Sequence, residues 1–147
     1  MNTSTEVYFS SLLKTDYPKV YRAIVDVLDR HSIKHGLLES TRDYWCRDYM
    51  PVQSGFHDYI QFVYHPDYLK KERQYETDST TVFDNAQALT GIVPTLSHLI
   101  ADGGNFTFCR SREGKPVIVM TEKIFAEIPS WSREEVIAEW RVVFHQT

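Results

Sequence analysis

The chain has 147 residues, of which 42% are hydrophobic and 24% charged, a composition typical of one globular domain (residues 1–147). With 20 Asp and Glu against 16 Lys and Arg, its net charge of −4 argues against a protein that binds nucleic acid through its charge. No apolar run approaches the roughly 20 residues of a membrane-spanning helix, the polar start is unlike a signal peptide, and two cysteines are too few for a disulfide scaffold. We therefore expect a cytoplasmic protein with no membrane segment.

The first predicted element is an amphipathic helix over residues 16–30. Its apolar side chains recur at spacings of three and four, at Tyr17, Val20, Tyr21, Ile24, Val27 and Leu28. Asp16 is the expected N-cap, and Pro18 lies in the first turn, where its missing N–H breaks no helical hydrogen bond. Gly36 is a stop signal, so the helix and its exit are expected to occupy residues 16–35.

The middle of the chain predicts one strand and one helix. Residues 59–64 are rich in β-branched and aromatic side chains, which favours a strand. Residues 67–80 are charged and irregular, as in an exposed loop. A helix is expected over about residues 81–89, because Gly91 and Pro94 follow as stop signals.

The last third of the chain predicts a hairpin and then a helix. Residues 106–109 and 117–120 are the expected strands, and the second is apolar throughout, as is typical of a buried strand. Residues 132–135 (Ser-Arg-Glu-Glu) form a capping box, which predicts the start of a helix. No strand follows this helix, so we expect its apolar stripe to be exposed; the stripe consists of Val136, Ile137, Trp140, Val143 and Phe144.

Two acid-bearing turns lie 54 residues apart, at Asp48 and Asp102. Each is followed by strand-like segments and then by a helix. A repeat of this length is typical of a propeller or a similar radial architecture, in which one unit cannot bury its faces alone.

The first candidate site is the aromatic-rich stretch around Asp48. This carboxylate could bind a cation, and Trp45 could flank the cation through its ring face. The alternative is that Arg47 and Asp48 form a solvated ion pair while Trp45 belongs to the core.

The second candidate site is Asp102 with the two glycines and the asparagine that follow it. Paired glycines at the mouth of a strand allow the backbone to approach a ligand closely. The alternative is a plain β-turn or bulge. A phosphate-binding loop is excluded, because no Gly-Lys-Ser/Thr follows.

Histidines and cysteines form no recognisable catalytic or metal-binding pattern. His31 and His35 lie four residues apart but lack a third ligand, so no zinc site is expected. Cys46 could be a nucleophile, but nothing in the sequence directs a histidine toward it, and a half-buried structural thiol is the favoured interpretation. Cys109 is expected to be inert within its strand.

Four motifs, spread over residues 41–128, together suggest a family. They are, in chain order, Trp45-Cys46-Arg47-Asp48-Tyr49-Met50-Pro51, Gln61-Phe62-Val63-Tyr64 with Pro66-Asp67-Tyr68-Leu69, Asp102-Gly103-Gly104-Asn105-Phe106, and Met120-Thr121-Glu122-Lys123-Ile124-Phe125. This series resembles the agmatine deiminase and bacterial peptidylarginine deiminase family of the guanidino-group-modifying superfamily. The resemblance implies an α/β fold, a partial pentein-type propeller with about two of five ββαβ blades (residues 36–96 and 97–147) after the helix 16–35.

The resemblance also implies roles for individual residues. Asp48 matches the carboxylate of a Trp-x-x-Asp motif that grips the substrate guanidinium. Asp102 matches an acid of the same site in related proteins, and Trp45 is implied to flank the cation. The implied supporting residues are Arg47, Gly103, Gly104 and Asn105.

The family hydrolyses a guanidinium to a ureido group and ammonia through a cysteine thiolate and a histidine, without metal or organic cofactor. The family's Gly-His-x-Asp motif and late cysteine are absent from this sequence, and Cys46, Cys109 and His145 do not match them. We therefore expect the N-terminal part of a deiminase-like hydrolase, of the kind used in putrescine biosynthesis, which recognises agmatine or free or peptidyl arginine but is inactive alone. The alternative is a non-catalytic module that binds guanidino ligands or a protein partner, with self-association through an exposed blade edge.

Overall fold

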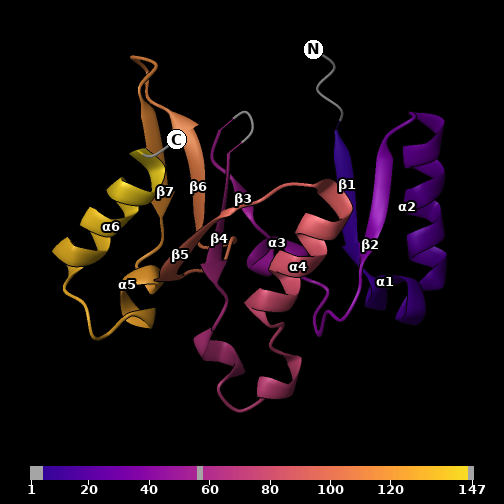
Figure 1. The fold of residues 1–147 in the computed structure, drawn as a ribbon, viewed down its shortest axis with the longest axis horizontal. Coiled ribbons are helices and arrows are strands. Elements are labelled where there is room, and N and C mark those ends of the chain that lie inside the picture. The colour runs from indigo at the N-terminus through magenta and orange to yellow at the C-terminus, as the bar shows by residue number, and fades with distance from the viewer. Residues whose placement is uncertain (1–4, 56–57, 146–147) are drawn as a thin grey trace.

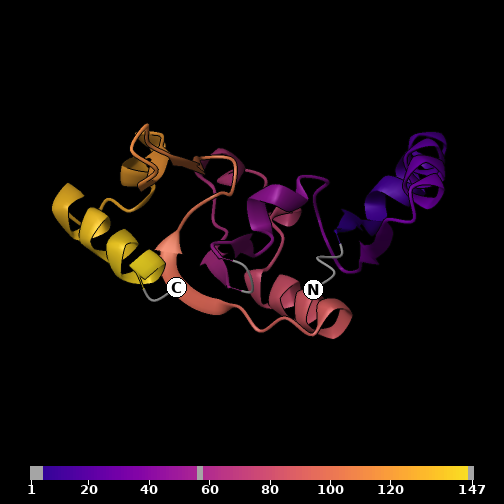
Figure 2. The ribbon, with the colours of Figure 1, turned by 90° about the horizontal axis from the view of Figure 1, so that it is seen from above.

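Three small β-sheets follow one another in the computed structural model, which describes residues 5–55 and 58–145 (Figure 1). Helices alternate with the strands, so the fold is mixed α/β, as expected. Seen from above, helices α2 (Pro18–Arg30), α4 (Ser79–Thr90) and α6 (Arg133–His145) come in turn from right to left (Figure 2). Within the described ranges, no helix has the length and apolar character needed to cross a membrane.

The first sheet pairs β1 (Glu6–Ser10) with β2 (Lys34–Leu38) in parallel. Parallel neighbours need a crossover, which α1 (Ser11–Asp16) and α2 supply. The sequence does not predict β1. The helix and exit predicted over residues 16–35 are longer than the observed helix, because α2 ends at Arg30 and β2 begins four residues later.

The N-terminus of α2 differs from the prediction. Tyr17 is the N-cap and makes no side-chain cap, whereas Asp16 belongs to α1. Pro18 is the first residue of α2, as predicted. Gly36 is not a helix stop but lies inside β2, where a Cβ would come within 2.9 Å of the Tyr8 ring. The apolar stripe of α2 exists but is not buried, and Val20 is 51% exposed.

The second sheet has the order β3 (Val52–Gln53), β4 (Tyr59–Val63), β5 (Thr95–Ile100). β3 is antiparallel to β4, and β5 is parallel to β4 after the crossover through α4. The predicted strand 59–64 and helix 81–89 are therefore confirmed. Asp78 caps α4 by accepting from two backbone N–H groups, and Gly91 ends it at a left-handed φ of 69°.

The third sheet is the hairpin of β6 (Phe106–Arg110) and β7 (Pro116–Met120). The hairpin is confirmed, but the prediction that its second strand is buried is wrong. Only one face of β7 is half-buried, at Ile118 and Met120, whereas Val117 is 36% and Val119 54% exposed. Alternate residues of a strand point to opposite faces, so this strand carries apolar side chains on both faces.

Helix α6 begins at the predicted capping box. Ser132 Oγ accepts from Glu135 N at 3.2 Å, and Glu135 Oε2 accepts from Ser132 N at 2.7 Å. The prediction that its apolar stripe is exposed is wrong, since the exposed fraction is 0% for Val136, 2% for Trp140 and 7% for Val143. The reason is tertiary: α6 turns back across the preceding strands and packs against their aromatic side chains.

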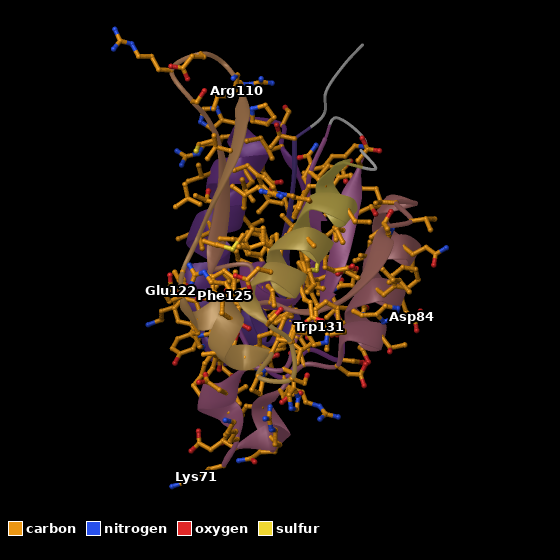
Figure 3. All side chains as sticks on the ribbon, turned by 90° about the vertical axis from the view of Figure 1, so that its left-hand side faces the viewer. Lys71, Asp84, Arg110, Glu122, Phe125 and Trp131 are labelled. Carbon is orange, nitrogen blue, oxygen red and sulfur yellow. The ribbon has the colours of Figure 1, made fainter. Side chains whose placement is uncertain are left out.

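The start of α6 is also fastened to α5 (Lys123–Glu127). Arg133 Nη2 donates to Glu122 Oε1 at 2.9 Å, and the Arg133 guanidinium lies 4.1 Å from the centroid of the Phe125 ring. Figure 3 shows Glu122 and Phe125 next to each other, with Trp131 in the turn that leads into α6.

The larger core joins the second and third sheets. The Trp140 ring stacks on Phe62 of β4 at a centroid distance of 5.1 Å and meets Phe106 of β6 edge-on at 4.8 Å. Such aromatic pairs contribute about 1 kcal/mol beyond the area that they bury. A second cluster packs the end of β2 against α3 (Cys46–Tyr49), η1 (Asp67–Leu69) and α4, and it consists of Leu38, Tyr49, Tyr64, Leu69 and Val82. The larger core thus fixes β6 relative to β4.

The predicted repeat corresponds to a similar order of elements. After Asp48 come β3, β4, α4 and β5, and after Asp102 come β6, β7, α5 and α6. The expected boundary between residues 96 and 97 falls inside β5.

Candidate functional site

The two acid-bearing turns of the repeat are in direct backbone contact. Asp48 lies in α3 (Cys46–Tyr49), a single helical turn before β3, and Asp102 lies in the turn that follows β5. Gly103 N donates to the Asp48 carbonyl oxygen at 3.2 Å, and Gly104 N donates to Asp48 Oδ1 at 3.0 Å. Turns 54 residues apart in the sequence therefore form one site.

This contact requires glycine at position 103. A Cβ there would lie 1.9 Å from the carbonyl oxygen of Arg47, and a Cβ at position 104 would lie 2.9 Å from Asp48 Oδ1. Asn105 N also donates to the Asp102 carbonyl oxygen at 2.9 Å, as in a β-turn. The paired glycines are thus both part of a turn and the place where another backbone approaches closely.

An open pocket of about 580 Å³ lies beside this contact and is lined by both aspartates. Five of the seven predicted site residues line it, namely Trp45, Asp48, Asp102, Gly104 and Asn105, together with residues 42–44, Tyr68, Leu69, Tyr75 and Lys123. Arg47 and Gly103 lie outside the lining. They support the turns instead, since Arg47 Nη2 donates to the Phe106 carbonyl oxygen at 3.5 Å.

Trp45 is not a core residue, because 68% of it is exposed. The alternative of an Arg47–Asp48 ion pair also does not hold, since no such pair exists among the described residues. Asp48 is half-buried. Burial raises the pKa of its carboxyl, while the Gly104 N–H lowers it.

Asp102 is buried at the base of the pocket and is only partly satisfied. Its Oδ2 accepts from Asn105 Nδ2 at 3.2 Å, and Lys123 Nζ lies 3.6 Å away. Its Oδ1 is buried and has no hydrogen-bond partner in the part of the chain that the structure describes. Burial, followed by the negative charge of Glu127, raises the pKa of Asp102 to about 6. A buried acceptor without a donor costs free energy, so the negative charge of Asp102 is only partly compensated by its neighbours.

The sequence reasoning missed two charged residues beside Asp102. Lys123 Nζ lies 3.0 Å from Asp67 Oδ1 and 3.2 Å from Glu127 Oε1, and 4.6 Å from the centroid of the Tyr68 ring. The four-residue spacing of Lys123 and Glu127 in one helix is the only signal that the sequence offers for their pairing. Nothing in it places them against Asp102.

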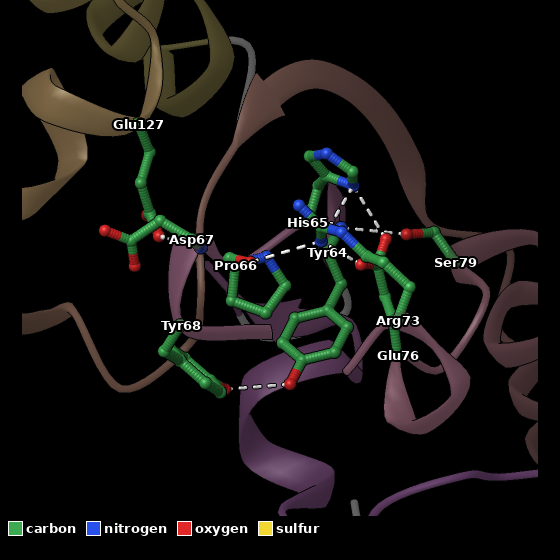
Figure 4. Close-up of polar contacts among 9 residues, drawn as sticks. All are labelled: Tyr64, His65, Pro66, Asp67, Tyr68, Arg73, Glu76, Ser79 and Glu127. Atoms are coloured by element: carbon green, nitrogen blue, oxygen red, sulfur yellow. Dashed lines mark hydrogen bonds and ion pairs between the residues drawn. The ribbon is translucent and has the colours of Figure 1, made fainter. Parts of the chain in front are cut away.

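One wall of the pocket is the loop between β4 and α4, which holds η1 (Asp67–Leu69) and η2 (Arg73–Tyr75). Figure 4 shows how side chains fasten this loop. Its ends meet where Ser79 Oγ accepts from Tyr64 N at 2.9 Å, and inside it His65 Nδ1 lies 2.7 Å from Glu76 Oε1. Two further contacts hold it at the site: the hydroxyls of Tyr64 and Tyr68 are 2.9 Å apart, and Asp67 N donates to Glu127 Oε1 at 3.3 Å.

Neither cysteine lines the pocket, and no described histidine does. Cys46 is half-buried, as expected, with its Sγ 3.2 Å from the Tyr49 hydroxyl, and burial raises the pKa of its thiol, which disfavours the thiolate that a nucleophile needs. Cys109 is exposed on β6. His35 Nε2 contacts Asp29 Oδ1 at 3.0 Å, and no group of described residues could hold a metal ion. The side chain of His145 lies outside the described residues.

No protein-family model matches the chain, and no curated protein matches it. The chemistry of the pocket itself must therefore support any functional assignment.

The packing of the glycines makes a paired prediction. Gly103→Ala should lower the free energy of unfolding by about 2 kcal/mol or more, because its Cβ meets a backbone oxygen that cannot rotate away. Gly104→Ala should cost less than about 1 kcal/mol, because the Asp48 side chain can rotate away from the new Cβ. Urea unfolding measures both values. Equal stability of the Gly103→Ala variant and the unaltered chain would contradict the close approach.

Proposed function

We propose that this pocket binds the guanidinium group of agmatine or of an arginine, and that the chain is the guanidinium-binding part of a deiminase-like hydrolase. The observation that carries the proposal is one pocket that is lined by the buried, only partly satisfied Asp102, the half-buried Asp48 and the exposed Trp45. The motif resemblance points to the same ligand.

The chemistry of a guanidinium fits these three groups. It is a planar cation with five N–H donors, so it can donate to two carboxylates at once. It is more weakly hydrated than an ammonium, which lowers the cost of placing it beside a buried acid, and its flat face stacks on aromatic rings such as that of Trp45.

The order of elements supports the propeller that the resemblance implies. β3, β4, α4 and β5 have the ββαβ order of a blade, and β6, β7 and α6 follow in the order of a second blade as far as its helix. In this proposal Asp48 and Asp102 are equivalent residues of successive blades. Their turns meet because neighbouring blades present the same turn to a common centre.

The proposal separates binding from hydrolysis. Deiminase chemistry needs a thiolate and a proton-transferring group at the guanidinium, and the described lining residues include neither a cysteine nor a histidine. The 147-residue chain should therefore bind agmatine without converting it. Release of carbamoylputrescine or ammonia by the purified chain would contradict this part of the proposal.

Isothermal titration with agmatine tests the binding site. Asp48→Asn and Asp102→Asn should each weaken binding by at least tenfold, because each removes one charge-assisted pair with the guanidinium. Asp84→Asn is the matched control, since Asp84 is exposed on α4, on the opposite side of the view from Glu122 (Figure 3). Putrescine, which lacks the guanidinium, should bind more weakly than agmatine. Equal affinities for the two ligands, or no effect of either site variant, would disprove the assignment.

A second candidate function, self-association through the hairpin, is favoured by the exposure of β7. Val117 and Val119 are exposed, and the sheet contains only two strands among the described residues, so the outer edge of β7 is open. Apolar strands with an open edge pair readily with another chain.

Sedimentation velocity over a range of concentrations tests the self-association. The chain should form dimers as its concentration rises, and Val119→Lys should keep it monomeric, because a charged side chain on an edge strand opposes pairing. Val142→Lys is the control, since Val142 is 50% exposed on α6 rather than on the strand. A monomer at every concentration would rule this function out.

A further inference from the structure

One ammonium group is shared by three carboxylates at the base of the pocket. Lys123 Nζ lies 3.0 Å from Asp67 Oδ1, 3.2 Å from Glu127 Oε1 and 3.6 Å from Asp102 Oδ2. The acids differ in burial, because the side chains of Asp102 and Glu127 are only 5% and 2% exposed whereas that of Asp67 is 45% exposed. Lys123 is therefore the cation that faces a buried pair of acids.

The buried pair is short of compensating groups. Besides Asp102 Oδ1, Glu127 Oε2 is buried without a hydrogen-bond partner in the described part of the chain. The other charged group that faces Asp102 is Asp48, which is also negative, and the nearby phenols of Tyr64 and Tyr68 supply no positive charge. Two carboxylates that share a site cannot both stay ionised without a balancing cation.

Lys123 is placed to balance part of this charge. Its ammonium group is closest to the carboxylates of Asp67 and Glu127 and lies over the ring of Tyr68. The longest of its three contacts with acids is the one to Asp102. It reaches Oδ2, which Asn105 also contacts, and leaves Oδ1 unpaired. Burial opposes the charge of Lys123, but the hydrogen bonds to Asp67 and Glu127 and the nearby carboxylates outweigh it, so its pKa is raised and it stays protonated.

We propose that Lys123 is a positioning residue whose charge partly balances the buried Asp102–Glu127 pair and thereby keeps the Asp102 carboxylate ionised for the ligand cation. This inference rests on the proposed guanidinium site and deepens it. With Lys123 in place, the base of the pocket still holds more acidic groups than basic ones, because one ammonium faces three carboxylates, and this favours a cationic ligand.

The direction in which ligand affinity changes with pH depends on which protonation state of Asp102 binds the ligand. A guanidinium pairs with the ionised form of Asp102, so affinity should rise with pH as this carboxyl loses its proton, with a midpoint near its pKa of about 6. Lys123→Met removes the balancing charge, so more of Asp102 should be protonated at any given pH. Glu127→Gln removes the repelling charge and should have the opposite effect, while its amide oxygen can still accept from Asp67 N.

Carboxyl-carbon NMR titration of Asp102, assigned with Asp102→Asn, is the test, together with agmatine titrations at pH 6.5 and 8.5. In Lys123→Met the titration midpoint of Asp102 should rise by at least one pH unit. For a rise of one pH unit, agmatine affinity should fall about threefold at pH 6.5, and further for a larger rise, and it should return to nearly that of the unaltered chain at pH 8.5. Lys123→Arg, which keeps the charge, should change the midpoint little, and Glu127→Gln alone should lower it.

The double variant Lys123→Met/Glu127→Gln keeps the test valid if Lys123→Met does not fold. It removes one positive and one negative charge together, so the Asp102 midpoint should return toward its original value and binding at pH 6.5 should recover. An unchanged Asp102 midpoint in both Lys123→Met and Glu127→Gln would overturn the inference, as would an equal loss of affinity at both pH values that the double variant does not restore.

The NMR measurement needs no ligand, so the two proposals can fail separately. If agmatine binds to no variant but the Asp102 midpoint moves as expected, the guanidinium assignment is wrong and the charge-balancing role of Lys123 stands. If agmatine binds and the Asp102 midpoint does not move, the guanidinium assignment stands and the charge-balancing role of Lys123 is wrong.

Discussion

The pocket depends on the close approach of two backbone turns, one at Gly103 and the other at Arg47. Gly103 N–H bonds to the Asp48 carbonyl oxygen, and the missing side chain at position 103 leaves room for the Arg47 carbonyl oxygen. Because the turns touch, Asp48 and Asp102 line the same pocket although they lie 54 residues apart in the sequence. Any side chain at position 103 would push the two turns apart and divide the site.

The core holds this contact in register. Trp140 lies against Phe62 of the second sheet and Phe106 of the third, so the helix that ends the chain fixes the two strands next to the acid-bearing turns. The same arrangement brings α5 under the pocket, where Lys123 reaches three acids. Packing in the larger core, the position of the turns and the electrostatics of the pocket are thus linked.

Local sequence patterns predict most of the elements, because capping boxes and apolar periodicity act over a few neighbouring residues. The two aspartates are candidates because of the composition of their turns and the motif resemblance. They do not predict which faces meet. The stripe of α6 is buried and the strand β7 is exposed, opposite to expectation, because both outcomes depend on how α6 turns back onto earlier strands. Lys123 and Glu127 escape prediction for the same reason, since only the fold brings them to Asp102.

The central claim is that two successive turns form one pocket for a single guanidinium, and nuclear magnetic resonance of the ¹⁵N-labelled chain during an agmatine titration tests it most directly. The Trp45 indole and Gly104 amide signals should shift along one saturation curve, because one ligand contacts both turns. The Gly114 amide, in the distant hairpin turn, should not move. Shifts confined to one turn, or two curves with different midpoints, would contradict the claim.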